Sequence, residues 1–322
     1  MAEAVLHPPR RTHTLTYNLE IAIGLFLAYC RSKNLSPKTV GYYAARLLAF
    51  SRFSVNRLTS IQEIDAAAIR EFLTHEKETN SAATANHSLC TLRVFLGFLH
   101  AEGFLEENPA ASVTRLKVKK RVIETFSPEQ IEAVLRTCGR DFYGVRDRAV
   151  ILTLLDCGLR ASELCSLELA DVDWQEQSFR VEGKGAKERI VPFGQGVRRA
   201  LASYLAIRTE NLPTRSLFVT QYGEPLTRYR LRDLVKRRCN RAGIEGVRPS
   251  PHTLRHTCAV SYLRSGGDTF TLQLLLGHTS QDMTRRYCES LSAADVQRKH
   301  RDFSPVDNMK GIAPRSGRKR LR

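Results

Sequence analysis

The sequence contains no run of eighteen or more apolar residues, so no segment of it predicts a membrane-spanning helix. Its first residues, MAEAVLHPPRRTH, lack the apolar core that a secretory signal peptide needs. We therefore expect a protein of the cytoplasm that is neither secreted nor bound in a membrane.

Several motifs of cofactor and metal sites are also missing. There is no G-x-x-x-x-G-K-[ST] phosphate loop and no G-x-S-x-G turn, so nothing in the sequence indicates ATP or a nicotinamide. The eight cysteines include no C-x-x-C pair and mostly lie in helix-like apolar patterns. Such cysteines are typical of reduced thiols in a core, rather than of disulfides or a zinc cluster. We expect no cofactor.

Charge of one sign is what the sequence has in excess. Its 50 Lys and Arg against 33 Asp and Glu give a formal net charge of +17. A surplus of that size on a folded protein favours a polyanionic partner, either nucleic acid or an acidic membrane. The 322 residues, 42% of them apolar, are enough for two domains that each bury a core.

The first of these domains is predicted over residues 18–107, after an extension at 1–17. Its apolar residues recur at intervals of three and four, as in IAIGLFLAYCRSKNL and NHSLCTLRVFLGFLHAEG. This periodicity predicts a small domain of about four helices. Ser36 and Pro37 form a typical helix start, and Gly103 is placed to end the last helix.

A basic linker without apolar periodicity is predicted at residues 108–125. It is either a solvated connector or a segment that neutralises phosphates when the chain wraps around DNA, and we favour the second. Its candidate DNA-binding residues, beside Arg115, are Lys117, Lys119, Lys120 and Arg121.

The second domain is predicted over residues 126–303 and is also mainly helical. It begins at FSPEQIEAVLR, where Ser127 caps a helix that Pro128 starts. The segment SFRVEGKGAKERIVPFG predicts two short strands joined by a Gly-Lys-Gly turn. The predicted class is therefore α+β, mainly α with one small β-hairpin. The basic tail at residues 304–322 is predicted to lack fixed structure without a partner.

The stretch PHTLRHTC, residues 251–258, allows two interpretations. His252 and His256 lie four apart and could share a metal, whereas His252 and Arg255 lie three apart and could both face an anion. The metal interpretation is weak because Thr253 stands where H-E-x-x-H needs a glutamate, and because Arg255 would repel a metal ion. We therefore predict an anion site and no metal.

Other residues could join such a site. Arg160, after the turn at Gly158, is predicted at a helix N-terminus, where free N–H groups favour an anion. Lys184 lies between two glycines at the hairpin tip, and His278 and Tyr287 follow in LLGHTSQDMTRRY. Each has a plain structural explanation by itself, such as an ion pair between Arg160 and Glu163.

Taken together and in this order, the residues resemble the tyrosine recombinase (phage integrase) family, and most closely its Xer-like branch. The resemblance covers about residues 18–303 and includes CGLRASELCSLELADVD, EGKGAKERIVP and SPHTLRHTCAVSYLRSGGD. It departs from the family at Thr-Phe-Thr, residues 269–271, and in the basic tail. The family's catalytic positions are filled by Arg160, Lys184, His252, Arg255, His278 and Tyr287.

The resemblance implies a helical SAM-like core-binding domain, a mixed catalytic domain and a site-specific DNA recombinase that needs no metal or ATP. Tyr287 would attack a DNA phosphodiester to give a 3′-phosphotyrosine, and strand exchange would pass through a Holliday junction. Arg160 and Arg255 would clamp the non-bridging oxygens, for which forked guanidinium donors are well suited.

The resemblance also implies how protons would move. His252 would be the base for the tyrosine, Lys184 would protonate the leaving 5′-oxygen, and His278 would donate a hydrogen bond to the phosphate. His256 is expected to be structural, packed under the site and bonded to backbone.

The partners that the resemblance implies are double-stranded recombination sites and a homotetramer on two of them, or a hetero-tetramer with a paralogue, in the nucleoid of a prokaryotic cell. The biological outcome would be integration or excision of a mobile element, or Xer-type dimer resolution. A type IB topoisomerase and a DNA-binding regulator on an inactive recombinase scaffold are the alternatives.

Overall fold

The computed structural model describes residues 18–118, 124–183, 188–208, 213–278 and 280–304. The chain divides into two compact units, residues 1–120 and 121–322, and each is described by itself. Both are mainly helical, and the second also holds one small antiparallel sheet. The predicted fold class is therefore confirmed.

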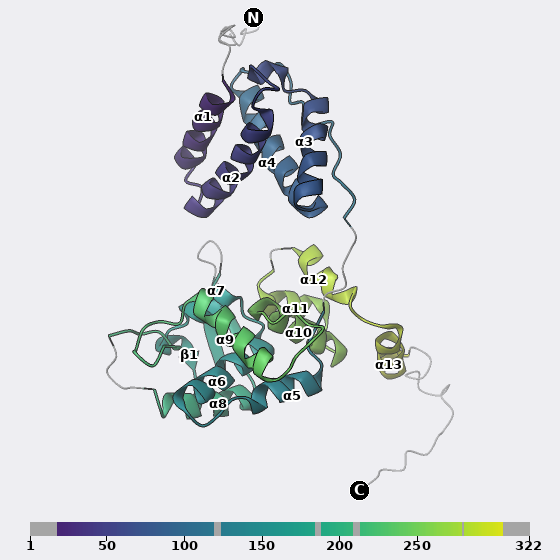
Figure 1. Ribbon diagram of the computed structural model, residues 1–322. Coiled ribbons are helices and arrows are strands. Elements are labelled where there is room, and N and C mark those ends of the chain that lie inside the picture. The colour runs from purple at the N-terminus through teal and green to yellow at the C-terminus, as the bar shows by residue number, and fades with distance from the viewer. Residues whose placement is uncertain (1–17, 119–123, 184–187, 209–212, 279, 305–322) are drawn as a thin grey trace, which may run out of the picture. The chain divides into compact units, whose positions relative to one another are not determined.

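The first unit is a bundle of helices (Figure 1). Its apolar core includes Phe26, Phe50 and Phe95. Side chains of Ser36 and Ser81 accept hydrogen bonds from backbone N–H groups in the first turns of two of its helices, as expected of N-caps. Its elements are α1 (Leu19–Ser32), α2 (Pro37–Ser54), the 3-10 helix η1 (Ile61–Glu63), α3 (Ala66–Thr79) and α4 (Ala82–Ala101).

The first half of the predicted linker packs on α4 of this unit. The side chain of Asn86 bonds to both the backbone N–H and the carbonyl of Leu116, at 2.8 and 2.9 Å. Arg93 donates to the carbonyls of Ala110 and Val113, two residues that are buried in the core of the unit. This segment has no helical period because backbone-to-side-chain bonds, rather than an apolar stripe, hold it in place.

The second unit supplies the scaffold of the site. Ser127 caps its first helix in a capping box with Gln130, and Pro128 is the first helical residue, as predicted. Its helices are α5 (Pro128–Arg136), α6 (Phe142–Cys157), α7 (Ala161–Ser166), the 3-10 helix η2 (Leu169–Asp171), α8 (Gln195–Leu205), α9 (Arg228–Arg241), α10 (Pro251–Arg264), α11 (Thr269–Leu276), α12 (Gln281–Cys288) and α13 (Ala293–Phe303).

The predicted hairpin is present and is extended by one short strand. The sheet has the order β1 (Val172–Asp173), β2 (Ser178–Glu182) and β3 (Glu188–Pro192), with antiparallel pairing throughout. The hairpin tip, including Lys184, lies outside the described residues. The two-residue β1 is too short to give an alternating pattern in the sequence.

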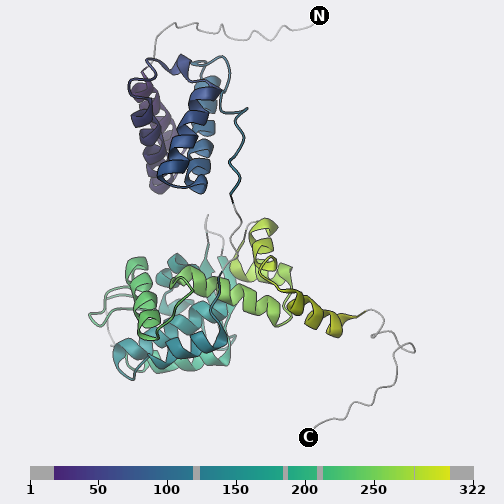
Figure 2. The ribbon, with the colours of Figure 1, turned by 45° about the vertical axis from the view of Figure 1, so that its right-hand side comes forward.

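Two apolar clusters order the second unit. In the larger one α6 packs against α8 and α10. Figure 2 shows the helices of this unit from a second side. The smaller one joins α10, α11 and α12 and includes Leu263, Leu272, Leu276 and Tyr287. Tyr287 is therefore part of a packed cluster.

Among the described residues, the helices are too short or too polar to span a membrane.

Candidate functional site

The turn between α6 and α7 brings Arg160 to the site. Gly158 ends α6 in the left-handed region, with φ 58° and ψ 29°, and Arg160 is the N-cap of α7. A Cβ on Gly158 would lie 2.6 Å from the Leu276 side chain, so the turn needs glycine both for its conformation and for space. The close approach of this turn to the end of α11 allows Arg160 to reach that helix.

Helix α10 supplies Arg255 from its first turns. Ser250 caps the helix and Pro251 begins it, so the side chains that follow have fixed directions. The guanidinium of Arg255 donates to the carbonyl of Gly158 at 2.5 Å and to that of Leu276 at 2.8 Å. Only 5% of its side chain is exposed, against 32% for Arg160. The Arg255 side chain is therefore shielded from solvent, whereas part of the Arg160 side chain is accessible to it.

Glu163, in α7, accepts hydrogen bonds from two arginines. Arg160 donates to it from Nη1 at 2.6 Å, and Arg189 forms a two-pronged pair with both of its oxygens at 3.0 and 2.9 Å. Burial alone would raise the pKa of this carboxyl, but the bonds from Arg189 and Arg160 outweigh it and hold the pKa at about 2. Glu163 is thus a permanent anion among cations.

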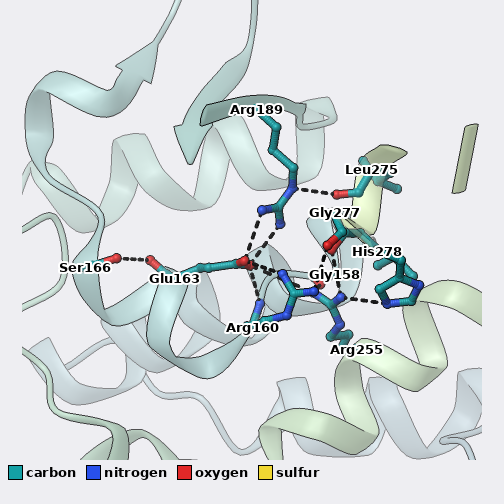
Figure 3. A network of polar contacts seen from close by, with 10 residues as sticks. Gly158, Arg160, Glu163, Ser166, Arg189, Arg255, Leu275, Gly277 and His278 are labelled. Carbon is teal, nitrogen blue, oxygen red and sulfur yellow. Dashed lines mark hydrogen bonds and ion pairs between the residues drawn. The ribbon is translucent and has the colours of Figure 1, made fainter. Parts of the chain in front are cut away.

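The C-terminal end of α11 gathers the same arginines. The carbonyls of Leu275, Leu276 and Gly277 each accept a hydrogen bond from one guanidinium, and the three donors are Arg189, Arg255 and Arg160. Figure 3 shows this arrangement, with the Glu163 carboxylate between Arg189 on one side and Arg160 on the other. The last carbonyls of a helix lack helical partners and carry partial negative charge, so they favour cations.

His278 follows this helix end and contacts Arg255. Its Nε2 lies 3.0 Å from Nη2 of Arg255, and its Nδ1 lies 2.9 Å from the hydroxyl of Thr284. Because a guanidinium only donates, Nε2 must accept and Nδ1 must carry the proton. Burial, with the charges of Arg255 and Arg160, lowers the pKa of His278 to about 4, so the ring is neutral. In this arrangement Nε2 is not free to donate to a phosphate, in contrast to the expected role.

Tyr287 lies within α12 and is 4% exposed. Its hydroxyl is 3.3 Å from Nδ1 of His256, and its ring stacks against that of His278. Burial lowers the pKa of His256 to about 4, so the ring beside the Tyr287 hydroxyl is neutral. Burial raises the pKa of Tyr287, and Arg255 partly opposes that shift. The expectation that His256 bonds to backbone is wrong, because its hydrogen bond goes to the tyrosine.

His252 faces outward on α10 and is exposed. Within the described part of the chain it has no hydrogen-bond partner, and its ring centroid is 6.5 Å from that of His256. Neighbouring groups still desolvate part of its ring, and this partial desolvation, followed by the charge of Arg255, lowers its pKa. His252 therefore lies on the same helix as Arg255 but makes no contact with Tyr287 in this arrangement.

Five predicted residues remain, and the structure describes one of them. Lys117 is exposed in the first unit. Lys119, Lys120, Arg121 and Lys184 lie outside the described residues. Across the described ranges, no group of three or more His, Cys, Asp or Glu side chains could hold a metal ion.

Sequence reasoning missed Arg189 altogether and treated Glu163 only as a possible surface partner of Arg160. The Arg-x-x-Glu spacing at 160–163 is a signal that could have identified Glu163, because N-cap and N3 side chains meet at a helix start. Arg189 has no such signal. It lies on an edge strand in a run of charged residues, and only the approach of α7 and α11 to that strand makes it part of the site.

Comparisons with known proteins agree with this architecture. A family model described as "Phage integrase family" matches residues 124–293, and one described as "Phage integrase, N-terminal SAM-like domain" matches residues 23–103. The chain is 33% identical over 281 residues to tyrosine recombinase XerC of Thermodesulfovibrio yellowstonii, covering 84% of this chain and 92% of the relative. It is 35% identical over 273 residues to tyrosine recombinase XerC of Listeria monocytogenes, covering 81% and 90%.

Solved structures share the fold. The XerH site-specific recombinase, bound to a palindromic difH substrate in a post-cleavage complex, aligns with a TM-score of 0.76 at 21% identity, covering 91% of this chain and 98% of that one. A lambda integrase dimer bound to a COC′ core site aligns with a TM-score of 0.69 at 21% identity, covering 82% and 96%.

Proposed function

This chain belongs to the phage integrase family of tyrosine recombinases, and from that membership we propose how its own residues break and rejoin DNA. It is a site-specific DNA recombinase. The observation that carries the proposed mechanism is the arginine cluster at the end of α11 with a buried tyrosine beside it. That arrangement suits a phosphodiester as substrate, since two guanidiniums can stabilise its growing charge.

In the proposed reaction the hydroxyl oxygen of Tyr287 forms a bond to phosphorus, and the bond from phosphorus to the 5′-oxygen breaks. The phenolic proton passes to a base, for which we propose His252, and the leaving 5′-oxygen takes a proton from Lys184. A 5′-hydroxyl of the partner strand then attacks the phosphotyrosine in the reverse sense, by way of a Holliday junction. The bond energy is kept in the phosphotyrosine, so no ATP is consumed.

The described arrangement corresponds to a resting state in this proposal. The Tyr287 hydroxyl is buried and hydrogen-bonded to His256, so it must turn away from that bond to reach a phosphate. Arg255 would exchange the Nε2 of His278 for a phosphate oxygen at the same time, which frees His278 to contact the substrate. A phosphate that Arg255 binds better in the rearranged state would shift the population toward that state.

We further propose that four protomers act together on two DNA sites, with α13 packing on a neighbour. Helix α13 has no buried residue, and its apolar side chains Val296 and Phe303 are exposed. Val296 and Phe303 are seven residues apart and so lie on one face of α13, which the neighbouring protomer would cover in this proposal. Deleting residues 289–322 should therefore damage recombination more than binding to a single half-site. Equal damage to both would contradict the packing of α13 on a neighbour.

The catalytic proposal is tested with a nicked trap duplex, in which the cleaved strand loses a short fragment and cannot religate. The duplex sequence is selected from a library of randomised nicked duplexes by recovery of the covalent protein–DNA adduct. Wild-type protein should form an adduct that proteinase digestion removes, and Tyr287→Phe should form none. An adduct with Tyr287→Phe would refute the nucleophile, and absence of any wild-type adduct would favour a DNA-binding regulator.

A second measurement separates a recombinase from a topoisomerase. Supercoiled plasmid without the selected site should stay supercoiled, whereas plasmid with two copies of the site should yield recombinant products. Relaxation of both plasmids would instead indicate a type IB topoisomerase.

A further inference from the structure

Arg189 is the one guanidinium of the cluster that the proposed reaction does not use. We infer that it is a positioning residue, which holds Glu163 so that Glu163 in turn holds Arg160 in the geometry required to clamp the phosphate. The inference rests on the proposed function and concerns the same site. It assigns Arg189 no contact with DNA.

The contacts of Arg189 are all directed into the protein. Its Nη1 and Nη2 donate to the two oxygens of Glu163 at 3.0 and 2.9 Å, and its Nε donates to the carbonyl of Leu275 at 3.1 Å. Its side chain is 14% exposed. A two-pronged pair of this kind fixes the plane of both partners, so the fork is not available to a substrate.

Gly277 gives independent evidence that the fold leaves space for the Arg189 guanidinium. A Cβ on Gly277 would lie 2.9 Å from both Cζ and Nη1 of Arg189, which is closer than real contacts allow. The guanidinium therefore lies flat against a backbone that has no side chain there. Gly277 also has φ 61° and supplies the carbonyl to which Arg160 donates.

The effect of Arg189 on Arg160 passes through Glu163. The carboxylate of Glu163 accepts from both the backbone N–H and Nη1 of Arg160, at 2.8 and 2.6 Å. Removing one partner of a buried ion pair leaves buried charge uncompensated, which favours rearrangement of the groups that remain. Without the fork of Arg189, Glu163 can turn toward Arg255, whose Nη1 is already 3.9 Å away, and Arg160 would lose its fixed orientation.

Charge supports the same division of roles. Glu163 is an anion with a pKa of about 2, and hydrogen bonds from Arg189 and Arg160 are the causes that lower it against burial. Arg189 balances that negative charge, so Arg160 and Arg255 keep their attraction for a phosphate. In the Arg189→Gln variant, only Arg160 and Arg255 would balance the negative charge of Glu163, which would weaken their attraction for a phosphate.

The test measures single-turnover cleavage of the selected trap duplex at saturating protein, half-site binding by gel shift, and thermal unfolding, all on the full chain. Arg189→Gln should cleave slower by about tenfold to a hundredfold, because displacement of a clamp by an ångström costs a factor of that order. Its half-site binding should change by less than about threefold, since Arg189 itself contacts no phosphate. Arg189→Lys keeps the charge without the fork and should fall between Arg189→Gln and wild type.

A double-mutant cycle isolates the route through Glu163. In a Glu163→Gln background, Arg189→Gln should slow cleavage much less than it does alone, since the carboxylate that it positions is gone. Equal slowing in both backgrounds would overturn the inference. Arg180→Gln is the matched control, because Arg180 lies on β2 of the same hairpin, is exposed and pairs with Asp171; it should cleave as wild type does.

The outcomes distinguish this inference from the proposed function. If wild type forms the covalent adduct and Arg189→Gln forms it equally fast, the inference fails and the proposed function stands. If loss of cleavage is matched by an equal loss of half-site binding, Arg189 serves docking, and the inference is again overturned. If no variant and no wild-type protein forms an adduct, the proposed function itself fails.

Discussion

Replacing Arg255 by alanine should lower both the rate of DNA cleavage and the free energy of unfolding, because Arg255 is proposed to bind the phosphate and also bonds to two buried carbonyls. Arg255 donates to the carbonyls of Gly158 and Leu276, and both bonds are almost fully shielded from water. A hydrogen bond that involves a charged group contributes about 1.5 kcal/mol or more, so the two together contribute roughly 3 kcal/mol. The Arg255→Ala variant should lose about that much free energy of unfolding.

Arg160→Ala provides the comparison. Arg160 also bonds to Glu163 and to Gly277, but about a third of its side chain is exposed, so water can replace part of what is lost. The Arg160→Ala variant should lose about 1 kcal/mol or less of its free energy of unfolding. Both variants should lose covalent cleavage of the trap duplex by a factor of about a hundred or more, since each removes a donor that stabilises transition-state charge.

The assay uses the single tryptophan of the chain. Trp174 packs against the larger core cluster of the second unit, so its fluorescence reports on the unfolding of that unit in urea or on heating. For a domain of 150–250 residues, roughly 3 kcal/mol corresponds to a fall in Tm of about 6–12 °C. Arg255→Ala should show this fall, and Arg160→Ala should show at most a few degrees.

Two results would refute this reasoning. If Arg255→Ala unfolds at the wild-type temperature, the buried bonds of Arg255 do not brace the fold. If Arg160→Ala destabilises the unit as much as Arg255→Ala, exposure does not distinguish the two arginines. Cleavage by either variant at the wild-type rate would remove that arginine from the clamp.

Other substitutions and conditions test further parts of the second unit. Asp147→Asn would leave two buried arginines without their shared carboxylate and should lower the free energy of unfolding by roughly 3–5 kcal/mol in Trp174-monitored urea melts; an unchanged midpoint would contradict this. Gly144→Ala would drive a Cβ into the backbone of Gly139 and should lower the Tm clearly, whereas Gly196→Ala, with open space around it, should not. Acidification should also destabilise the unit. The pKa values of His256 and His278 are about 4 when folded and about 6.5 when unfolded, so the unfolded chain binds more protons between these values and stability falls as the pH drops from 6.5 to 4. A urea midpoint at pH 5 equal to that at pH 7 would be the contrary result.

Much of the fold could be predicted because its signals are local. Ser36, Ser127 and Ser250 cap helices through bonds to backbone only three residues away, and the apolar periods of the long helices are plain in the sequence. The strand β1 and the packing of residues 108–116 on α4 were not predicted. Strand β1 has only two residues, too few to show an alternating pattern, and the packing of residues 108–116 depends on side chains of α4 that leave no period in that segment.

The site divides in the same way. The residue types and their order determined that Arg160, Arg255, His278 and Tyr287 are candidates for phosphoryl chemistry, because guanidiniums, imidazole and a phenol are the groups that such chemistry uses. Their spacing along the chain does not state what each side chain contacts. His256 is the plainest case, since its sequence position suggested a backbone bond and the fold gives it the tyrosine hydroxyl.

Composition and local pattern were enough to predict the helical two-unit plan, the excess of positive charge and the chemical groups of the candidate site. How those groups are held depends on tertiary contacts. Three carbonyls at the end of α11 and the carboxylate of Glu163 collect arginines from α7, α10 and β3 into one cluster. A helix end has free carbonyls in any sequence, but which guanidiniums reach it depends on the packing of elements far apart in the chain. Arg189 belongs to the site for that reason alone.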